Sequence, residues 1–344
     1  MNRDKAFSKI SEFTDRLTFD RVSVAGSSPK LRLWLLSLSD IHLGWENSQA
    51  EQLSYFLNIM TPEHLHLNGD IIDGEYLVQQ GRDALSDPSH VLALSTIFAK
   101  AQSIPTVLCV GNHDIGLEKL LHENLNGLKI LPKIHFNDPV GRKILAEHGH
   151  QEDIELRQNQ QGFWHWFGDH FIQMVQRLDR RNPCQLRKAL GLEADYSFAH
   201  DLKHGFGSRF LKDAILSRVR AIEAIKSKLD RLRTFDRVIS GHTHTGGFYR
   251  TDKGKLYMNS GDSTSYVQGL ACDRYGLWGL LTMRLDGLHI QTEHGYEYTE
   301  TWQDLGVDNP FSKIDHSRKL MGAFASSVRE VVHFSCPEIK PAPV

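Results

Sequence analysis

Short apolar runs in this chain end repeatedly in an acid, an amide or an imidazole next to a glycine or histidine. The run LRLWLLSLSD covers residues 31–40, HLHLNGD covers 64–70 and TVLCVGNHD covers 106–114. Nearly continuous apolar runs of this length are typical of strands that other layers cover on both faces. The pattern therefore predicts buried strands, as in an α/β or sandwich core, with polar side chains at their ends.

Helical patterns alternate with these strands. Residues 50–60 and 89–102 carry apolar side chains at helical spacing, each between two predicted strands. This alternation favours the α/β class. Further strand patterns follow, and we expect the last three of them to complete a second sheet. The five further strand patterns lie at 128–136, 142–150, 235–240, 255–262 and 275–285.

Strand patterns fade between residues 151 and 235, where helical spacing replaces them. The segment 162–181 is dense in aromatic residues, and 208–233 has the pattern of a long, basic, amphipathic helix. We interpret 151–235 as a helical insertion that caps the core. Its aromatic side chains are typical of a local core, and they would also suit an acyl-chain groove or a membrane-touching cap. They are Phe163, Trp164, Trp166, Phe167 and Phe171.

The chain therefore divides into a core with additions. We expect a helical N-terminal segment, a core in two parts on either side of the cap, and a C-terminal extension that ends in a loose, proline-rich tail. The corresponding ranges are 1–30, 31–150 and 236–298 for the core, 151–235 for the cap, and 299–344.

Composition indicates a globular protein and limits the kinds of partner and site to expect. With 344 residues, of which 40% are apolar and 24% charged, the chain can bury a full core. A net charge of −2 gives no indication of a nucleic-acid partner. The cysteines lie far apart, which indicates neither a zinc–thiolate site nor a disulfide framework. No signal peptide and no membrane span of ~18 residues is evident, so we expect a cytoplasmic protein or one peripheral to a membrane. The sequence does not indicate an oligomeric state.

Polar residues at the ends of five predicted strands suggest one shared site. In α/β sheets, ligands gather at the carboxyl ends of strands, where the loops converge. Carboxylate, carboxamide and imidazole groups without thiolates suit borderline divalent ions such as Mn, Fe, Zn or Co. The candidate ligands are Asp40, His42, Asp70, Asn112, His148, His242 and His244.

Seven candidate ligands are too many for one four-coordinate ion, but they suit two ions about 4 Å apart that share a carboxylate. We expect Asp70, alone in its segment, to be the shared ligand. Alternate residues of an extended segment point to opposite sides, so a turn is required for His242 and His244 to reach neighbouring ions. We expect Gly241 and the pair at 246–247 to supply the backbone freedom for it. The first ion would take Asp40, His42 and His244, and the second would take Asn112, His148 and His242.

The motifs DIH, GDIID, GNHD, HGH and GHTH occur in this order between residues 31 and 262. This set resembles the calcineurin-like metallophosphoesterase superfamily. Each motif alone is weak, whereas five in the same order are specific. The resemblance implies a four-layer α/β/β/α sandwich, here with a helical cap insertion, and two divalent ions. It favours Mn²⁺, with Fe or Zn as alternatives.

Within that superfamily, LSDIHLG, LNGDIIDGE, HGHQED and YMNSGD resemble most the branch that contains UDP-2,3-diacylglucosamine pyrophosphatase, a peripheral-membrane enzyme. The chain departs from that branch at three positions. His150 stands where an aspartate is typical, Ser263 where a tryptophan is typical, and His113 where the best-known pyrophosphatases have arginine. These departures leave the expected metal ligands intact.

The expected chemistry is hydrolysis by a metal-activated hydroxide, because coordination lowers the pKa of water from 15.7 to about 7. By resemblance, His113 is not a ligand and donates a proton or hydrogen bond to the leaving oxygen. We expect Asp114 and Asp73 to orient the imidazoles. For Asp73, a role as a helix N-cap is an equal alternative.

Other histidines have simpler interpretations. His64 and His66 alternate within a predicted strand, where packing or surface positions are the expected roles. Four more lie in the cap and are typical of solvated helix positions, although they would also suit a substrate pocket. They are His165, His170, His200 and His204.

The predicted function is the hydrolysis of a phosphoester or pyrophosphate bond, with a phosphorylated small molecule or a UDP-diacylglucosamine-like glycolipid as substrate. One alternative is a soluble nucleotide phosphodiesterase or a phosphoprotein phosphatase whose cap gates access. Another is a non-catalytic scaffold that binds partners through its cap. The complete set of expected metal ligands argues against the scaffold.

Overall fold

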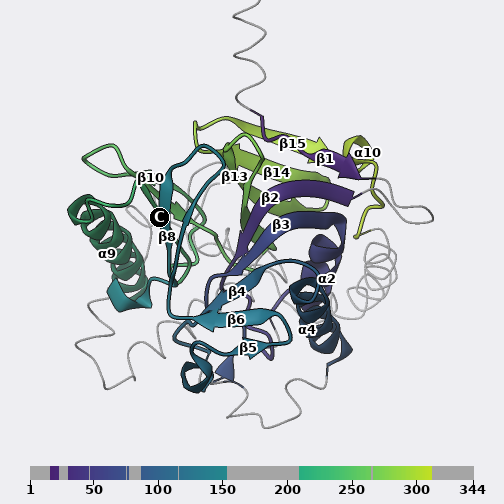
Figure 1. Ribbon diagram of the computed structural model, residues 1–344, viewed down its shortest axis with the longest axis horizontal. Coiled ribbons are helices and arrows are strands. Elements are labelled where there is room, and N and C mark those ends of the chain that lie inside the picture. Colours follow the sequence, from purple (N-terminus) through teal and green to yellow (C-terminus); the bar gives the residue numbers. More distant parts are fainter. Residues whose placement is uncertain are drawn as a thin grey trace, which may run out of the picture.

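The computed structural model describes residues 16–22, 30–45, 47–74, 76, 87–114, 116–152, 209–264 and 266–311, with the backbone alone from 209 to 217. Two β-sheets lie face to face, and helices cover their outer faces (Figure 1). This arrangement confirms the predicted α/β class and its four layers. The predicted cap from 153 to 208 lies outside the described residues.

The larger sheet has the order β15-β14-β13-β12-β2-β3-β4-β6-β5, and β1 pairs with β2. Strands β2, β3, β4 and β6 run parallel, while β12 to β15 form an antiparallel meander that joins through β12 to β2. The strands are β1 (Asp20–Val22), β2 (Lys30–Leu38), β3 (Met60–Leu67), β4 (Thr106–Cys109), β5 (Asn124–Leu125), β6 (Leu128–Leu131), β12 (Gln268–Cys272), β13 (Trp278–Arg284), β14 (Gly287–Thr292) and β15 (Glu297–Thr301).

The smaller sheet has the order β10-β11-β9-β8-β7, with β8, β9 and β11 parallel. Its strands are β7 (Ile134–Asn137), β8 (Lys143–Ala146), β9 (Arg237–Ser240), β10 (Gly247–Arg250) and β11 (Leu256–Asn259). The described helices are α2 (Ala50–Ile59), α4 (Pro88–Ala101), α9 (Arg209–Arg231) and α10 (Trp302–Leu305), with the short 3₁₀ turns η2 (Leu117–Leu120) and η3 (His150–Glu152).

Alternation along β2 explains why its sequence is apolar almost throughout. Leu35 packs toward the smaller sheet, in a cluster with Ile239 and Met258. Leu36 and Leu38 belong to the cluster that contains the residues of α2 and α4. Because successive side chains of a strand point to opposite faces, a strand covered on both faces needs apolar residues at every position.

The outermost layer on the smaller sheet is α9. Ile225 and Leu229 of this helix pack with Val238 of β9 and Tyr257 of β11. The predicted assignment of 209–231 to the cap therefore needs correction, because this helix covers a sheet of the core. Its amphipathic pattern alone does not reveal which surface its apolar side meets.

Three sequence predictions about the strands and termini were wrong. The run 275–285, expected in the second sheet, contains β13 of the larger sheet, since short turns keep β12 to β15 as antiparallel neighbours. The run 128–136 is two strands, one in each sheet. The terminal segments are not separate additions where they are described: β1 pairs with β2, and β15 with α10 completes the larger sheet and its cover. None of the described helices is long and apolar enough to cross a membrane.

Candidate metal centre

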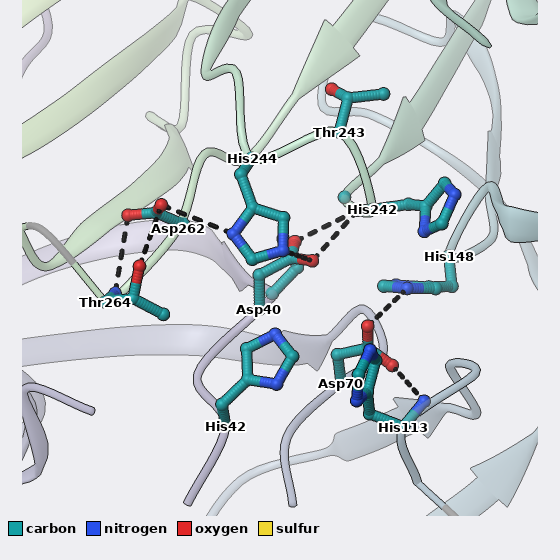
Figure 2. Close-up of polar contacts among 12 residues, drawn as sticks. Asp40, His42, Asp70, His113, His148, His242, Thr243, His244, Asp262 and Thr264 are labelled. Atoms are coloured by element: carbon teal, nitrogen blue, oxygen red, sulfur yellow. Dashed lines mark hydrogen bonds and ion pairs between the residues drawn. The ribbon is translucent and has the colours of Figure 1, made fainter. Parts of the chain in front are cut away.

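Six of the seven predicted ligands, all except Asn112, lie together at one end of both sheets in Figure 2. Asp40 and His42 follow β2, Asp70 follows β3, and Asn112 follows β4, all in the larger sheet. His148 follows β8, and His242 and His244 follow β9, both strands of the smaller sheet. The site is therefore assembled by two sheets that meet at the carboxyl ends of their parallel strands.

Three groups of possible ligand atoms form within this site, among them one of His42, Asp73 and His113, and the other two consist of predicted ligands. One contains Asp40, His42 and His244, which we name the Asp40 half-site, and the other contains Asp70, His148 and His242, which we name the His148 half-site. In each group the ligand atoms lie within 4.8 Å of one another. His244 Nε2 is 3.3 Å from an Asp40 oxygen, and His148 Nε2 is 3.0 Å from an Asp70 oxygen.

The backbone of these residues is unusual. Most of the non-glycine residues with positive φ in the described chain are predicted ligands: Asp40, His42, Asp70, His242 and His244, with φ between 52° and 64°. The left-handed region costs an L-residue roughly 1–2 kcal/mol, and such strain concentrates at functional sites. The turn that separates His242 from His244 uses this conformation in the histidines themselves. Gly241 is not left-handed, so our expectation that it supplies the freedom was wrong.

Three motif glycines instead allow close approach. A Cβ atom on Gly69 would lie 2.3 Å from His148 Nδ1, and one on Gly111 would lie 2.2 Å from Asp70 Oδ1. On Gly241 it would lie 2.3 Å from Asp40 Oδ2. Each glycine of GD, GN and GH thus leaves room for a ligand from another segment. Because these contacts join segments far apart in sequence, the motif pattern alone does not reveal them.

Hydrogen bonds fix which imidazole nitrogen faces the centre. His148 Nδ1 donates to the backbone oxygen of Asn68 at 2.8 Å. His42 Nδ1 lies 3.3 Å from an Asp73 oxygen, and His244 Nδ1 lies 3.3 Å from an Asp262 oxygen. A partner at Nδ1 leaves Nε2 as the metal-binding nitrogen.

Buried atoms without hydrogen bonds mark the same centre. Within the described part of the chain, these atoms include His42 Nε2 and Asn112 Oδ1, both on predicted ligands. A buried polar atom without a partner is costly, so a native structure supplies one. A divalent ion is the partner that suits imidazole, amide and carboxylate together. The donor set therefore fits metal ions.

Charge coupling in the centre is strong. Burial would raise the pKa of Asp70, but the histidines, His148 first, hold it well below its ordinary value. Burial would lower the pKa of His148, whereas Asp70 and Asp40 raise it to about 9. For His150, burial and the neighbouring His148 and His242 lower the pKa to about 3. Without a metal, His148 is thus protonated at neutral pH while His150 is neutral, and binding a metal requires His148 to give up its proton.

His113 lies beside the centre. Its backbone N–H donates to Asp70 Oδ1 at 2.7 Å, its ring is 4.8 Å from that of His42, and its Nδ1 is 3.7 Å from an Asp73 oxygen. The side chain is 19% exposed, more than the 5% of His42 and close to the 23% of His244, so it is accessible from the same side as His244.

The two acids expected to orient imidazoles differ in role. Asp73 contacts His42 and also accepts the backbone N–H of Tyr76 at 2.9 Å, so both of its proposed roles have a structural basis. Asp114 is buried and accepts backbone N–H groups at 2.8–3.0 Å. Its carboxylate therefore holds the loops in place rather than an imidazole. The donors are Asp70, Ile71, Ile72 and Gly111.

Two residues near the centre escaped the sequence analysis. They are Asp262, beside His244, and Asn68, which binds His148 through its carbonyl and whose amide donates to the carbonyls of Glu147 and Ile239. Asp262 had a signal, because NSGD after β11 repeats the form of LNGD after β3. Asn68 had none, because its role depends on contacts between the sheets.

The other histidines lie elsewhere or outside the described residues. His66 is buried with its ring 4.8 Å from that of Phe136, and His64 packs on Trp34 at 5.4 Å. Both are packing residues, as expected. The histidines at 165, 170, 200 and 204 and the cap aromatics lie outside the described residues.

Comparisons with known proteins found one matching family model and several solved structures of low similarity. No curated protein matches this sequence. Among solved structures, vacuolar protein sorting 29 from Cryptosporidium parvum is 12% identical and covers 77% of this chain and 97% of its own, with a TM-score of 0.34. A dimetal phosphatase from Danio rerio is 14% identical, with 78% and 98% covered and a TM-score of 0.35. An archaeal phosphodiesterase is 13% identical, with 72% and 99% covered and a TM-score of 0.35.

These structural overlaps are too loose to carry an argument, and the assignment rests on the family model. The model of the calcineurin-like phosphoesterases matches residues 33–246, which contain every predicted ligand. The match begins in β2 and ends just after His244. The chain therefore belongs to the calcineurin-like phosphoesterase family, whose members are hydrolases of phosphoester bonds.

Proposed function

We propose that this chain hydrolyses a phosphoester or pyrophosphate bond with two divalent ions bound side by side. The observation that carries the proposal is the pairing of two ligand groups at one end of the sheets, with Asp70 next to both. The Asp40 half-site would hold one ion, and the His148 half-site with Asn112 would hold the other. Asp70 would be shared between them.

Two such ions supply a nucleophile from water at neutral pH and neutralise charge on the phosphoryl oxygens. The protein's own residues do the remaining work. His113, next to the centre and partly exposed, is placed to donate a proton or hydrogen bond to the leaving oxygen. Asp73 keeps the His113 ring oriented, and it does the same for His42.

For the metal, we propose Mn²⁺, with Fe or Zn as alternatives. Imidazole together with carboxylate and one amide, without thiolate, suits these ions, whereas Mg²⁺ alone would favour an all-oxygen set. Metal analysis of the protein as purified tests this choice.

For the substrate, we propose a phosphorylated molecule, with a UDP-linked glycolipid pyrophosphate as the preferred class. Burial lowers the pKa of His244 and Asp40 raises it, with a net rise, and the Arg218 guanidinium of α9 also lowers it. Because Arg218 affects the pKa of His244, its positive charge lies near the centre, and this charge favours an anionic substrate. The basic, amphipathic sequence of α9 also favours peripheral contact with a membrane from the cytoplasmic side. A soluble nucleotide is the alternative substrate.

The test uses a chromogenic phosphodiester with metal-free protein, with and without added Mn²⁺. We expect activity only with metal, and we expect Asp70→Ala to reduce it by at least 10³-fold, in line with about 4 kcal/mol of lost transition-state stabilisation. Asp286→Ala, an exposed acid paired with His289, is the matched control. Metal-independent turnover, or full activity of Asp70→Ala, would refute the proposal.

A second assay separates the substrate classes. A UDP-linked glycolipid in detergent and the corresponding soluble UDP-sugar are compared under the same conditions. Preference for the lipid in kcat/KM supports the glycolipid, whereas equal or better turnover of the soluble compound supports the alternative.

A further inference from the structure

The loop that follows β11 lies directly behind the Asp40 half-site. The backbone N–H of Ser263 donates to the Asp40 carbonyl at 3.1 Å. The hydroxyl of Ser260 meets that of Ser39 at 2.7 Å, and the Ser39 hydroxyl also donates to the Asp40 carboxylate. This loop thus supports a ligand that lies more than two hundred residues earlier in the sequence.

Asp262 provides the same loop with a direct contact to a second ligand. Its side chain is 6% exposed, and one oxygen accepts from the Thr264 hydroxyl at 3.1 Å while facing His244 Nδ1 at 3.3 Å. Figure 2 shows the carboxylate between Thr264 and the imidazole. Because Thr264 fixes the carboxylate from behind, the His244 ring is held with Nε2 toward Asp40.

The two half-sites differ in the groups that contact the Nδ1 atoms of His42, His244 and His148. In the Asp40 half-site, His42 is backed by Asp73 and His244 by Asp262. In the His148 half-site, His148 is backed by the neutral carbonyl of Asn68. A carboxylate at Nδ1 makes an imidazole a stronger metal ligand and adds negative charge near the ion, whereas a carbonyl only orients it.

Asp114 does not remove this difference. It lies behind Asp70, but its oxygens already accept four backbone N–H groups, whose partial positive charges offset its own. Apart from the shared Asp70 and the imidazoles, the first ion would have the carboxylate of Asp40 as a ligand, whereas the second would have the neutral amide of Asn112. Ligand charge and the described contacts of His42, His244 and His148 favour the Asp40 half-site.

We propose that Asp262 is a positioning residue that acts through His244 and makes the Asp40 half-site hold its ion more firmly than the His148 half-site. This inference rests on the proposed function, because it concerns the same pair of ions. In this arrangement the ions bind one after the other, first at the Asp40 half-site.

The experiment is a metal-retention assay. Protein loaded with Mn²⁺ is dialysed against rising concentrations of a chelator, and the remaining metal is measured by elemental analysis. We expect two separate losses from the unaltered protein. Asp262→Ala should weaken the firmly held ion by about 10–100-fold, the usual effect of removing such a partner, and leave the weaker one nearly unchanged. Asp262→Asn, which keeps an acceptor but not the charge, should fall between.

Two further proteins assign the losses. His148→Ala should retain one firm ion, and adding Asp262→Ala to it should weaken that ion by the same factor. Asp286→Ala is the matched control, because it removes an acid 2.8 Å from His289 on the exposed surface of β14. Urea unfolding of the metal-free proteins separates loss of affinity from loss of folding, and Asp262→Asn keeps the shape if the alanine variant does not fold.

The outcomes are distinct. Simultaneous loss of both ions from the unaltered protein, or unchanged retention in both Asp262 variants, overturns this inference while the proposed function stands. Equal weakening of both ions by Asp262→Ala also overturns it. If the unaltered protein binds no divalent ion, the proposed function fails first, and the inference fails with it.

Discussion

The carboxylate of Asp114 offers the sharpest test of how the metal centre is built. It is 1% exposed and is the common acceptor for four backbone N–H groups. Oδ1 accepts from Ile71 and Ile72, and Oδ2 accepts from Asp70 and Gly111. These bonds join the loop after β3 to the loop after β4, and they hold Asp70 in its left-handed conformation.

Replacing Asp114 with alanine leaves these four donors buried without an acceptor. At about 1–2 kcal/mol for each lost bond, the loss of unfolding free energy is about 4–8 kcal/mol, a large share of the total for a typical domain. Asp114→Asn keeps one oxygen and turns an NH₂ group toward two N–H donors. We therefore expect it to lose about half as much.

The assay is equilibrium urea unfolding of chelator-treated protein, so that metal binding does not contribute. Asp87→Ala is the reference: it removes an exposed acceptor at the N-terminus of α4, with an expected loss of about 1 kcal/mol. The reasoning is refuted if Asp114→Ala costs no more than Asp87→Ala, or if Asp114→Asn is as stable as the unaltered protein. An order other than Ala, then Asn, then the reference would also contradict it.

Three other expectations follow from the same structure. Gly241→Ala should abolish retention of metal at the Asp40 half-site and cost about 1–3 kcal/mol in urea unfolding, because its Cβ would overlap Asp40; unchanged metal content would contradict this. Burial lowers the pKa of His66 to about 3 from 6.5, so its contribution to stability is present above pH 6.5 and is lost as pH falls toward 3. His66→Leu should thus reduce the stability loss between pH 7 and 4.5 by about 2–3 kcal/mol, measured by urea unfolding at both pH values. In metal-free protein, burial lowers and Asp70 raises the pKa of His148, to about 9, so stability should decline as pH rises from 6.5 through 9. Thermal unfolding of metal-loaded protein, whose His148 is already neutral, should lack that decline.

Much of the fold was predictable because the chain reveals local structure clearly. The apolar run of β2 and the helical spacing of α2 and α4 are properties of neighbouring residues, and each element lies within a few residues of its expected position. The placement of β13 was not predictable from its own sequence. A buried strand has the same apolar pattern in either sheet, so only its partners, β12 and β14, assign it.

The candidate site shows the same division. Residue types at the strand ends predicted a divalent metal centre, because metal preference depends on the kind of side chain. The order of the motifs indicated the family. The groups that hydrogen-bond to the imidazoles and orient them were only partly predictable. Asp73 was expected to orient an imidazole, whereas Asn68 and Asp262 were not predicted, because they contact their histidines from segments far away in the sequence.

The sequence by itself thus determined which groups are available for catalysis and which segments are strands or helices, since both depend on residues close together in the chain. The tertiary structure decided which groups contact the imidazoles from other segments, which acids support loops and which support imidazoles, and that α9 covers a sheet. These features depend on distances between segments as remote as Asp40 and Asp262. Such distances exist only once the two sheets have packed on one another.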